Sequence, residues 1–427
     1  MTGRTGHDAN EAGQDGVRHH LTTAQVADRL GVRQETVYAY VSRGLLTSHR
    51  EPGRRGSRFS VAEVEALAGA GRERRTSTGV LERIRTEITL LADDRLYYRG
   101  RDAVDLAASC SAEQVARLLW TGNLADHRPF AAPDDLVRSA RRTDRTLPPT
   151  ARLTDRIRVL LTTAALADPL RFDLDEGSVT NRTETLIGVL VRALPLVPGA
   201  KESHSAALAD QLWPRLTAED PTEEAVDHLR AALVLLADHD LAASTLAARL
   251  AASTRGPLYS VVSAGLGAVE GTAHGAASGV AYRFLREALD DTLGALADRL
   301  RTESALPGFG HRVYTGRDPR AEALLGRLRR SAEGSPRLAQ AVDVVDTIAD
   351  RLRDRPRGFP NIDLALAAMQ HGYRMRADAG EAVFAVARIA GWVAHALEEY
   401  REPGVRFRPA GVYVGPPPTP NAPTDHR

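Results

Sequence analysis

Residues 306–320 read LPGFGHRVYTGRDPR, and this stretch decides how the rest of the chain is interpreted. Pro307, Gly308 and Gly310 stand directly before His311, and proline and glycine both disfavour a helix interior. The stretch is therefore expected to be a loop that holds an imidazole in a fixed backbone setting. Catalytic side chains often lie on loops of a rigid scaffold, so His311 is a candidate functional residue. The alternative is that His311 is an exposed histidine on a surface loop without a function.

Two other stretches carry a histidine and an aspartate that could act together with His311. Residues 271–275 read GTAHG and place His274 between glycines, and residues 360–363 read PNID and place Asp363 after a proline. A carboxylate can remove a proton next to a carbonyl group while a neutral imidazole donates to the developing enolate oxygen. Arginines bind small di- and tricarboxylates through paired hydrogen bonds. The alternative role for Asp363 is structural, as the N-cap of the apolar helix expected after it.

The composition is that of a soluble globular protein. The 427 residues are 43% hydrophobic and 26% charged with a net charge of +1, so any nucleic-acid site must be local. The single cysteine, Cys110, excludes an internal disulfide and a cysteine-only metal cluster, and no metal-binding or phosphate-loop motif occurs. The N-terminus lacks the apolar segment of a secretory signal, and no apolar run approaches the roughly 20 residues of a membrane helix. We therefore expect a cytoplasmic protein without a metal site or a membrane partner.

The N-terminal part predicts a small DNA-binding-like domain over residues 21–68, after a polar segment at 1–20 that is expected to be disordered. A T-x-x-Q capping box at 22–25 opens a first helix, and a second helix is expected over roughly 33–43. An arginine-rich, hairpin-like loop then precedes a third helix. This outline resembles the winged helix-turn-helix of the MerR and excisionase type.

In that resemblance the second helix enters the major groove of DNA and the basic loop neutralises phosphates. The residues that would contact DNA are Arg33, Gln34, Thr36, Tyr38, Arg54, Arg55 and Arg58. A module of this size makes a short footprint, so specific binding would need a dimer. The alternative is a small helical module that docks onto another protein, and the basic loop favours DNA.

Beyond a Gly-rich linker at 69–79, residues 80–415 are predicted to form a second, larger domain. Apolar residues on either side of Asp93 and Asp94 indicate a short β-hairpin, and after it nearly every segment has helical spacing. The prediction is therefore an all-α domain, followed by a Pro-rich tail at 416–427 that is expected to be disordered.

Over roughly 84–415 the chain resembles the citrate synthase family. Residues 306–320 carry the family's P-G-F-G-H-x-V-Y…D-P-R loop intact, residues 271–278 are a looser version of its G-P-x-H-G-G-A-N loop, and residues 360–363 correspond to its N-V-D element. The resemblance implies a large and a small helical domain, the small one at roughly 275–370. It also implies condensation of acetyl-CoA with oxaloacetate to give citrate and CoA, with acetyl-CoA as co-substrate, no permanently bound cofactor and a homodimer.

The same resemblance assigns roles to individual residues. Asp363 would remove a methyl proton from acetyl-CoA, His274 would hydrogen-bond the enol oxygen, and His311 would polarise the ketone of oxaloacetate. The side chains expected to bind oxaloacetate are His239, Arg320, Arg388 and Arg408, the last from the neighbouring subunit. The residues expected to line the coenzyme A pocket are Gly308, Phe309, Gly310, Val313 and Tyr314.

The first loop departs from the family pattern at Thr272, Ala276 and Ser278. If position 276 requires a positive φ, alanine is strained there and shifts His274. Two alternatives to citrate synthesis therefore stay open. One is a 2-methylcitrate synthase that uses propionyl-CoA. The other is a DNA-binding transcriptional regulator whose synthase domain senses metabolites and is weakly active.

Overall fold

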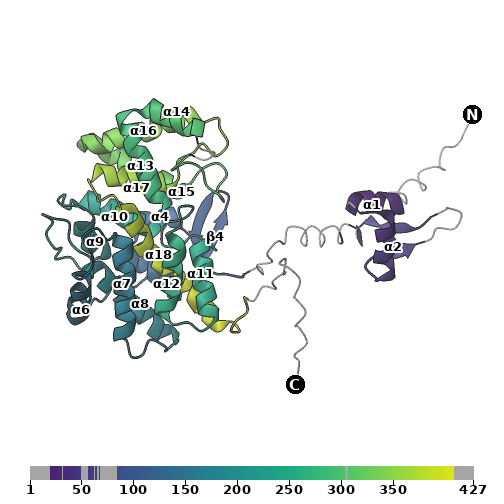
Figure 1. The fold of residues 1–427 in the computed structure, drawn as a ribbon, viewed down its shortest axis with the longest axis horizontal. Helices are drawn as coiled ribbons and strands as arrows, with labels where there is room; N and C mark the ends of the chain where they lie inside the picture. The colour runs from purple at the N-terminus through teal and green to yellow at the C-terminus, as the bar shows by residue number, and fades with distance from the viewer. Residues whose placement is uncertain are drawn as a thin grey trace, which may run out of the picture. The chain divides into compact units, whose positions relative to one another are not determined.

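A computed structural model describes residues 20–30, 32–49, 56–61, 63–64, 67, 84–302 and 306–407. The chain divides into two compact units, one made of residues 1–83 with 409–427 and the other of Ile84–Arg408 (Figure 1). The units are described one at a time below. The segments predicted to be a linker or a disordered end (1–19, 69–79 and 416–427) lie outside the described residues.

In the described part of the N-terminal unit, the helices α1 and α2 pack with a small antiparallel sheet, and residues 61, 63, 64 and 67, where a third helix is expected, are helical as well. Its elements are β1 (His20–Thr22), α1 (Thr23–Leu30), α2 (Gln34–Ser42), β2 (Ser48–His49) and β3 (Arg58–Ser60), and the sheet order is β1-β3-β2. The predicted capping box is present, because Thr22 N–H donates to Gln25 Oε1 at 2.9 Å and Gln25 N–H donates to Thr22 Oγ1 at 3.3 Å. Val26, Val37 and Phe59 form the small core. The predicted helix-turn-helix is therefore confirmed as a fold, and β2 and β3 pair as antiparallel strands, while residues 50–55 of the predicted basic loop lie outside the described residues.

The second unit begins with three antiparallel strands, β4 (Thr89–Ala92), β5 (Arg95–Tyr98) and β6 (Arg101–Asp102). Asp93 and Asp94 join the first two strands with φ angles of 52° and 53°. Two-residue hairpin turns of this kind need positive φ at both positions, and aspartate tolerates it better than most residues. The hairpin predicted around these two aspartates is confirmed.

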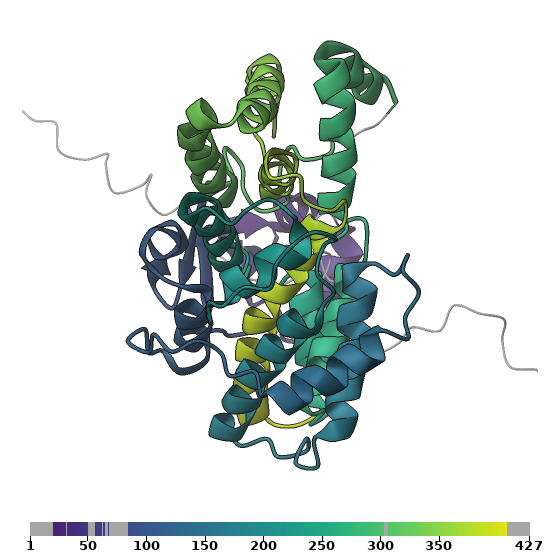
Figure 2. The same ribbon diagram turned by 90° about the vertical axis from the view of Figure 1, so that its left-hand side faces the viewer.

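Helices make up nearly all of the remaining unit, in two groups that Figures 1 and 2 show one above the other. The lower, larger group consists of α4 (Ala103–Ser109), α5 (Ala112–Thr121), α6 (Asp134–Asp144), α7 (Leu153–Ala167), α8 (Glu176–Ala193), α9 (Leu208–Leu216), α10 (Glu223–Leu235), α11 (Ala243–Ser253), α12 (Leu258–Val269) and α18 (Ala379–Arg401). The upper group consists of α13 (Ala277–Asp290), α14 (Thr292–Thr302), α15 (Pro319–Ser331), the 3-10 turn η2 (Ala332–Gly334), α16 (Pro336–Leu352) and α17 (Ile362–Gly372).

Helix α18 forms the centre of the larger group and packs against α5, α11 and α12. Its Trp392 is fully buried and lies so close to α12 that a Cβ on Gly265 would be 2.5 Å from the indole ring. In the part of the chain that the structure describes, α18 alone is long and apolar enough to cross a membrane. No apolar run of this length is expected from the sequence. Its apolar window is 100% buried inside the protein, as in a core helix.

The polypeptide passes between the two groups of helices at two connections. Residues 270–276 join α12 to α13, and residues 373–378 join α17 to α18. His274 lies on the first connection, and the loop that carries His311 lies within the upper group. Side chains from both groups therefore meet beside these connections.

Candidate active site

The loop around His311 is tied to the segment that enters α17. Gly310 N–H donates to Phe359 O at 2.8 Å, and Asn361 N–H donates to Gly308 O at 2.9 Å. The side chain of Asn361 adds a hydrogen bond from Nδ2 to Gly310 O at 2.9 Å. These bonds hold His311 next to the start of α17.

Two glycines allow this close approach. Gly308 and Gly310 have φ angles of 80° and 70°, which L side chains rarely adopt. A Cβ on Gly308 would lie 2.8 Å from Leu364 Cβ, and one on Gly310 would lie 2.9 Å from Arg357 Cβ. The glycines quoted from the sequence are therefore required both by backbone conformation and by space.

Asp363 lies in the first turn of α17 and does not cap it. The N-cap is Asn361, whose Oδ1 accepts the N–H groups of Asp363 at 3.1 Å and Leu364 at 3.4 Å. Asp363 Oδ1 is buried and has no hydrogen-bond partner among the described residues. Burial raises the pKa of Asp363 to about 7, although Arg320 acts in the opposite direction. A carboxylate with this pKa can act as a general base near neutral pH.

The hydrogen bonds of His311 define which ring nitrogen carries the proton. Its Nδ1 accepts the backbone N–H groups of Val313 at 3.1 Å and Tyr314 at 3.4 Å. Because a backbone N–H can only donate, the proton of the neutral ring is on Nε2. Burial, and then the charge of Arg320, lower the pKa of His311 to about 4. His311 is therefore a neutral hydrogen-bond donor through Nε2.

His274 has the opposite tautomer. Its Nε2 accepts the backbone N–H of Ser244 at 3.4 Å and lies 2.7 Å from the Ser244 hydroxyl. The ring proton is therefore on Nδ1. Burial, and then the charge of Arg388, lower the pKa of His274 to about 4, so this ring is also a neutral donor. Ser244 belongs to no motif quoted from the sequence, and sequence reasoning missed it.

The alanine at position 276 does not strain the first loop. Ala276 has φ −68° and ψ −9°, a right-handed conformation that any residue adopts. Position 276 therefore does not require a positive φ, and the strain that alanine would bring to such a conformation does not arise. The position in this loop that has no room for a side chain is Gly275, where a Cβ would lie 2.5 Å from Val269 Cγ1. The backbone around His274 is therefore compatible with this departure from the family pattern.

A third histidine lies beside His311. His239 follows α10, is buried, and its Nε2 lies 3.1 Å from the hydroxyl of Tyr314. The ring centroids of His239 and His311 are 5.0 Å apart, and those of His311 and Tyr314 are 4.8 Å apart. Burial lowers the pKa of His239 well below its usual range. Tyr314, predicted to line the coenzyme A pocket, is thus placed inside the histidine cluster.

Arg388 brings a cation to this site from the middle of α18. Its Nε donates to Leu236 O at 2.8 Å, and its guanidinium lies 4.5 Å from the ring centroid of Phe384. Both Nη1 and Nη2 are buried without a hydrogen-bond partner among the described residues. Burial lowers the pKa of Arg388. Buried unpaired donors on a cation are costly, so this pair of nitrogens suits an anionic ligand such as a carboxylate.

Arg320 is positioned differently. Its Nε donates to Asp318 Oδ1 at 3.0 Å and its Nη2 donates to Asp318 Oδ2 at 2.8 Å, and both side chains are buried. Burial acts to lower the pKa of Arg320, but Asp318 outweighs it and raises that pKa. Asp318 also accepts the N–H of Ile362 at 3.0 Å. Asp318, held by Arg320, therefore links the end of the His311 loop to α17, and Arg320 adds positive charge to the site.

Beside the His311 loop lies a cavity of about 420 Å³. Its lining includes Phe309, Gly310, Arg312, Arg355 and Arg357. Of the other residues predicted to bind substrate, Val313 is 50% exposed, and Arg408 lies outside the described residues. Within the described ranges, no group of three or more His, Cys, Asp or Glu side chains is arranged to hold a metal ion.

The residues predicted to contact DNA belong to the other unit. Arg33 and Gln34 are exposed at the start of α2, and Tyr38 is 57% exposed on the same helix. Thr36 and Arg58 are half-buried. Arg54 and Arg55 lie outside the described residues. The structure therefore places part of the predicted set on an accessible helix.

Two family models match the chain. The model described as "Citrate synthase, C-terminal domain" matches residues 79–410, and a helix-turn-helix domain model matches residues 21–72. Among curated proteins, the chain is 27% identical over 351 residues to citrate synthase 2 of Bacillus subtilis, covering 78% of this chain and 93% of that one. It is 29% identical over 340 residues to 2-methylcitrate synthase of Mycobacterium tuberculosis, covering 75% and 84%.

Solved structures agree with these matches. Citrate synthase from Thermoplasma acidophilum, in a ternary complex with carboxymethyl coenzyme A and oxaloacetate, superimposes with a TM-score of 0.66 at 24% identity, covering 82% of this chain and 98% of that one. Citrate synthase from Thermotoga maritima superimposes with a TM-score of 0.64 at 25% identity, covering 83% and 99%. The predicted architecture, helical domains preceded by a small helix-turn-helix, is confirmed.

Proposed function

We propose that this chain, which belongs to the citrate synthase family, is an active acyltransferase that condenses acetyl-CoA with oxaloacetate to give citrate and CoA. The strongest support is that one buried site combines a base, two hydrogen-bond donors and a cation. A carboxylate with a pKa of about 7, two neutral imidazoles of defined tautomer and an arginine with two unpaired donors lie together there. That set suits proton abstraction next to a thioester and the binding of a dicarboxylate.

In the first step of the proposed reaction, Asp363 removes a proton from the methyl group of acetyl-CoA. The electron pair of the broken C–H bond forms the C=C bond of the enol, and the thioester oxygen takes a hydrogen bond from Nδ1–H of His274. Both groups are prepared for these roles before substrate arrives. The Asp363 carboxylate is poorly solvated, and the proton of His274 is fixed on Nδ1 by Ser244.

In the second step the enol carbon attacks the ketone carbon of oxaloacetate. His311 donates from Nε2 to the ketone oxygen, which becomes the hydroxyl of the product, and the unpaired nitrogens of Arg388 hold a carboxylate. His239, next to His311, completes the pocket around the ketone. Water then adds to the citryl thioester, the C–S bond breaks, and CoA leaves as the thiol.

The coenzyme A portion is proposed to occupy the cavity beside the His311 loop. Three arginines line it, Arg312, Arg355 and Arg357, and the phosphate groups of coenzyme A require cations. Gly310 and Phe309, from the same loop, also line this cavity. Propionyl-CoA, and hence 2-methylcitrate synthesis, is the second choice of acyl donor, in line with the 2-methylcitrate synthase relative.

A homodimer is proposed from the exposed apolar side chains of the larger group. Leu166, Leu170 and Phe172, at and just after the end of α7, are 76%, 66% and 67% exposed, and Leu250 on α11 is 47% exposed. Large apolar side chains exposed close together along the chain, as at positions 166, 170 and 172, favour a protein interface. Sedimentation of the wild type as a dimer and of Phe172→Asp as a monomer would support this arrangement, and a wild-type monomer would contradict it.

A second candidate function is a DNA-binding regulator whose synthase unit senses oxaloacetate or an acyl-CoA. It is favoured by the exposed Arg33, Gln34 and Tyr38 on α2. DNA affinity that weakens steeply with salt and falls in Arg33→Ala would support it. Affinity that is absent or independent of salt would contradict it.

The proposed activity is tested by thiol release. Purified protein is mixed with acetyl-CoA, and in parallel with propionyl-CoA, each with and without oxaloacetate. Oxaloacetate-dependent release that disappears in His311→Ala is the expected result, and the acyl-CoA with the higher kcat/KM identifies the acyl donor. A folded protein that binds oxaloacetate without releasing thiol from either donor would contradict the enzyme and leave the sensor.

A further inference from the structure

A second polar cavity, of about 750 Å³, lies beside both connections between the helix groups. It is lined by Thr272 and Ala276 from the first connection and by Arg376 and Asp378 from the second. None of its lining residues belongs to the cavity beside the His311 loop. It is therefore a separate site, and the proposed reaction does not use it.

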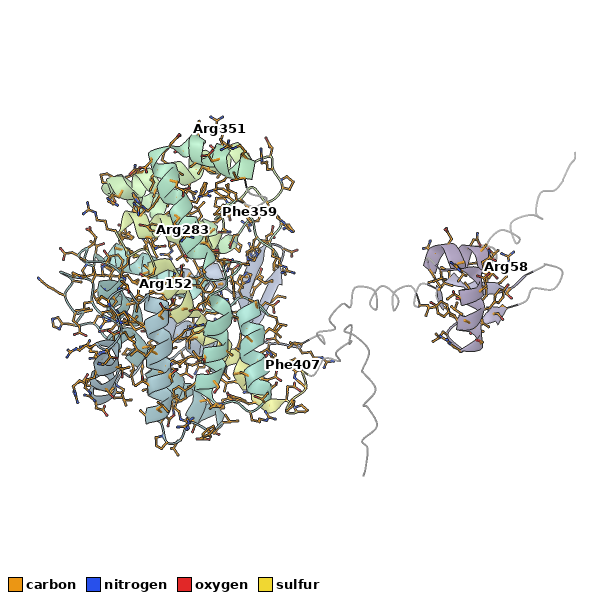
Figure 3. The ribbon with its side chains drawn as sticks, in the orientation of Figure 1. Arg58, Arg152, Arg283, Arg351, Phe359 and Phe407 are labelled. Atoms are coloured by element: carbon orange, nitrogen blue, oxygen red, sulfur yellow. The ribbon has the colours of Figure 1, made fainter. Side chains whose placement is uncertain are left out.

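Four arginines line this cavity: Arg152 at the start of α7, Arg283 and Arg286 on α13, and Arg376 before α18. Figure 3 labels Arg152 and Arg283, which come from the lower and upper groups of helices. Arginines from both groups thus surround one volume.

The carboxylates that line the cavity are already paired. Glu381 accepts a hydrogen bond from Arg152, and Asp378 accepts one from Arg376 Nε at 3.0 Å. Glu270 lies 2.9 Å from Arg158 Nη1. Every acidic side chain of the lining therefore has its own arginine.

Arg283 and Arg286 are the two cations left over. Both are exposed, and neither makes a hydrogen bond or ion pair within the described part of the chain. They are three residues apart on α13, a spacing that places two side chains on the same face of a helix. Arg283 lies near enough to Glu381 to interact with its charge, but the hydrogen bond of Glu381 goes to Arg152. Two adjacent guanidinium groups facing a cavity, neither of them bonded to an acid that the structure describes, favour an anion with several oxygens.

We propose that this cavity binds a phosphate-bearing small molecule, with its phosphoryl groups on Arg283 and Arg286. Guanidinium groups bind phosphate oxygens in paired hydrogen bonds, and the volume is that of a site for a nucleotide-sized ligand rather than for a single inorganic ion. Tyr282, half-buried on the same helix, also lines the cavity and offers a flat apolar surface to the rest of the ligand.

A ligand in this cavity would contact both groups of helices. An anion on Arg283 and Arg286 lies next to Arg152 and Arg376, which belong to the other group of helices and its connection. Such a ligand bridges the two groups where the chain passes between them. His274 lies on the same connection as Thr272 and Ala276, so the cavity adjoins the segment that carries a residue of the proposed active site.

The test is equilibrium binding of ATP and of pyrophosphate to the full-length protein, measured by calorimetry. CoA is left out, because its own phosphate groups would compete for Arg283 and Arg286. The wild type is expected to bind ATP, and binding that depends on these two arginines is assigned to this cavity, because neither lines the cavity beside the His311 loop. In Arg283→Gln/Arg286→Gln the affinity is expected to fall about tenfold or more. Binding of pyrophosphate that also depends on both arginines assigns the contact to the phosphoryl groups.

The matched control is Arg351→Gln, an exposed arginine of α16 in the same group of helices that does not line the cavity (Figure 3). It is expected to bind ATP as the wild type does. Equal loss in the control and in the double variant, or no ATP binding by the wild type, would overturn the proposal. Because all three arginines are exposed, equal melting temperatures are expected, which separates loss of binding from loss of folding.

Discussion

The carboxylate of Asp94 accepts the backbone N–H of Thr315 at 2.8 Å, so the tip of the β4–β5 hairpin holds the loop that carries His311. The neighbouring N–H of Gly316 adds a second hydrogen bond at 2.7 Å. These bonds, that of Thr315 first, lower the pKa of Asp94 below its usual range. A residue far away in the sequence thereby fixes the position of Tyr314 and, through it, of the histidine cluster.

Replacing Asp94 by alanine is expected to lower kcat/KM for oxaloacetate roughly 10- to 100-fold, because small misplacements of catalytic groups are costly. The control is Asp93→Ala. Both aspartates have left-handed φ angles of 52° and 53°, so alanine introduces the same backbone strain at either position. Steady-state kinetics that changed equally in both variants would mean that the hairpin turn, and not the bond to Thr315, matters.

Ser244→Ala is expected to lower kcat about tenfold while oxaloacetate binding stays unchanged, because Ser244 fixes the tautomer of His274. Ser278→Ala is a suitable control. Ser278 is fully buried near the same loop, and its hydroxyl has no partner among the described residues. Comparable rates in the two variants, measured by thiol release, would remove Ser244 from this role.

The rate should depend on pH through Asp363. Its carboxylate must be ionised to accept a proton, and burial raises its pKa to about 7. As pH falls through 7, the protonated fraction grows, and kcat/KM for acetyl-CoA should drop about tenfold for each further pH unit. His274 and His311, with pKa values of about 4, stay neutral across this range. A profile that is flat down to pH 5 would show that Asp363 is not the base.

The two buried arginines should respond differently to replacement by methionine. Arg388→Met removes a cation with two unpaired donors, so the protein without substrate should lose little stability, while stabilisation by oxaloacetate disappears. Arg320→Met leaves the buried Asp318 unpaired and should lower the free energy of unfolding by about 3–5 kcal/mol. Thermal melts with and without oxaloacetate distinguish the two. Equal loss of stability in the two variants without substrate would contradict the proposal that the unpaired nitrogens of Arg388 bind a substrate carboxylate.

The sequence was sufficient to predict the elements that depend on local chemistry. Backbone requirements that depend on a few neighbouring residues explain three of these elements: the glycines before His311, the Asp93–Asp94 turn and the capping box at Thr22. The family resemblance then supplied the helical fold. The same local reasoning overestimated the cost of Ala276, because the φ of a loop position depends on the helix that starts beside it.

The partners of the candidate catalytic residues could not be predicted in this way. Ser244 is 30 residues from His274, and Asp94 is 221 residues from Thr315, so no spacing rule connects them. The unpaired nitrogens of Arg388 are equally invisible in sequence, because they result from burial by the surrounding helices. Long-range packing therefore determined the tautomers, the pKa values and the unpaired charge of the site.

The most direct test of the central claim is the rate of oxaloacetate-dependent CoA release from acetyl-CoA by the wild type and by Asp363→Asn. The substitution keeps the size of the side chain and removes the base. Release by the wild type, with a loss of at least about 100-fold in a variant that still binds oxaloacetate, is the predicted result. Equal release by both proteins, or no release by either while oxaloacetate still binds, would contradict the account.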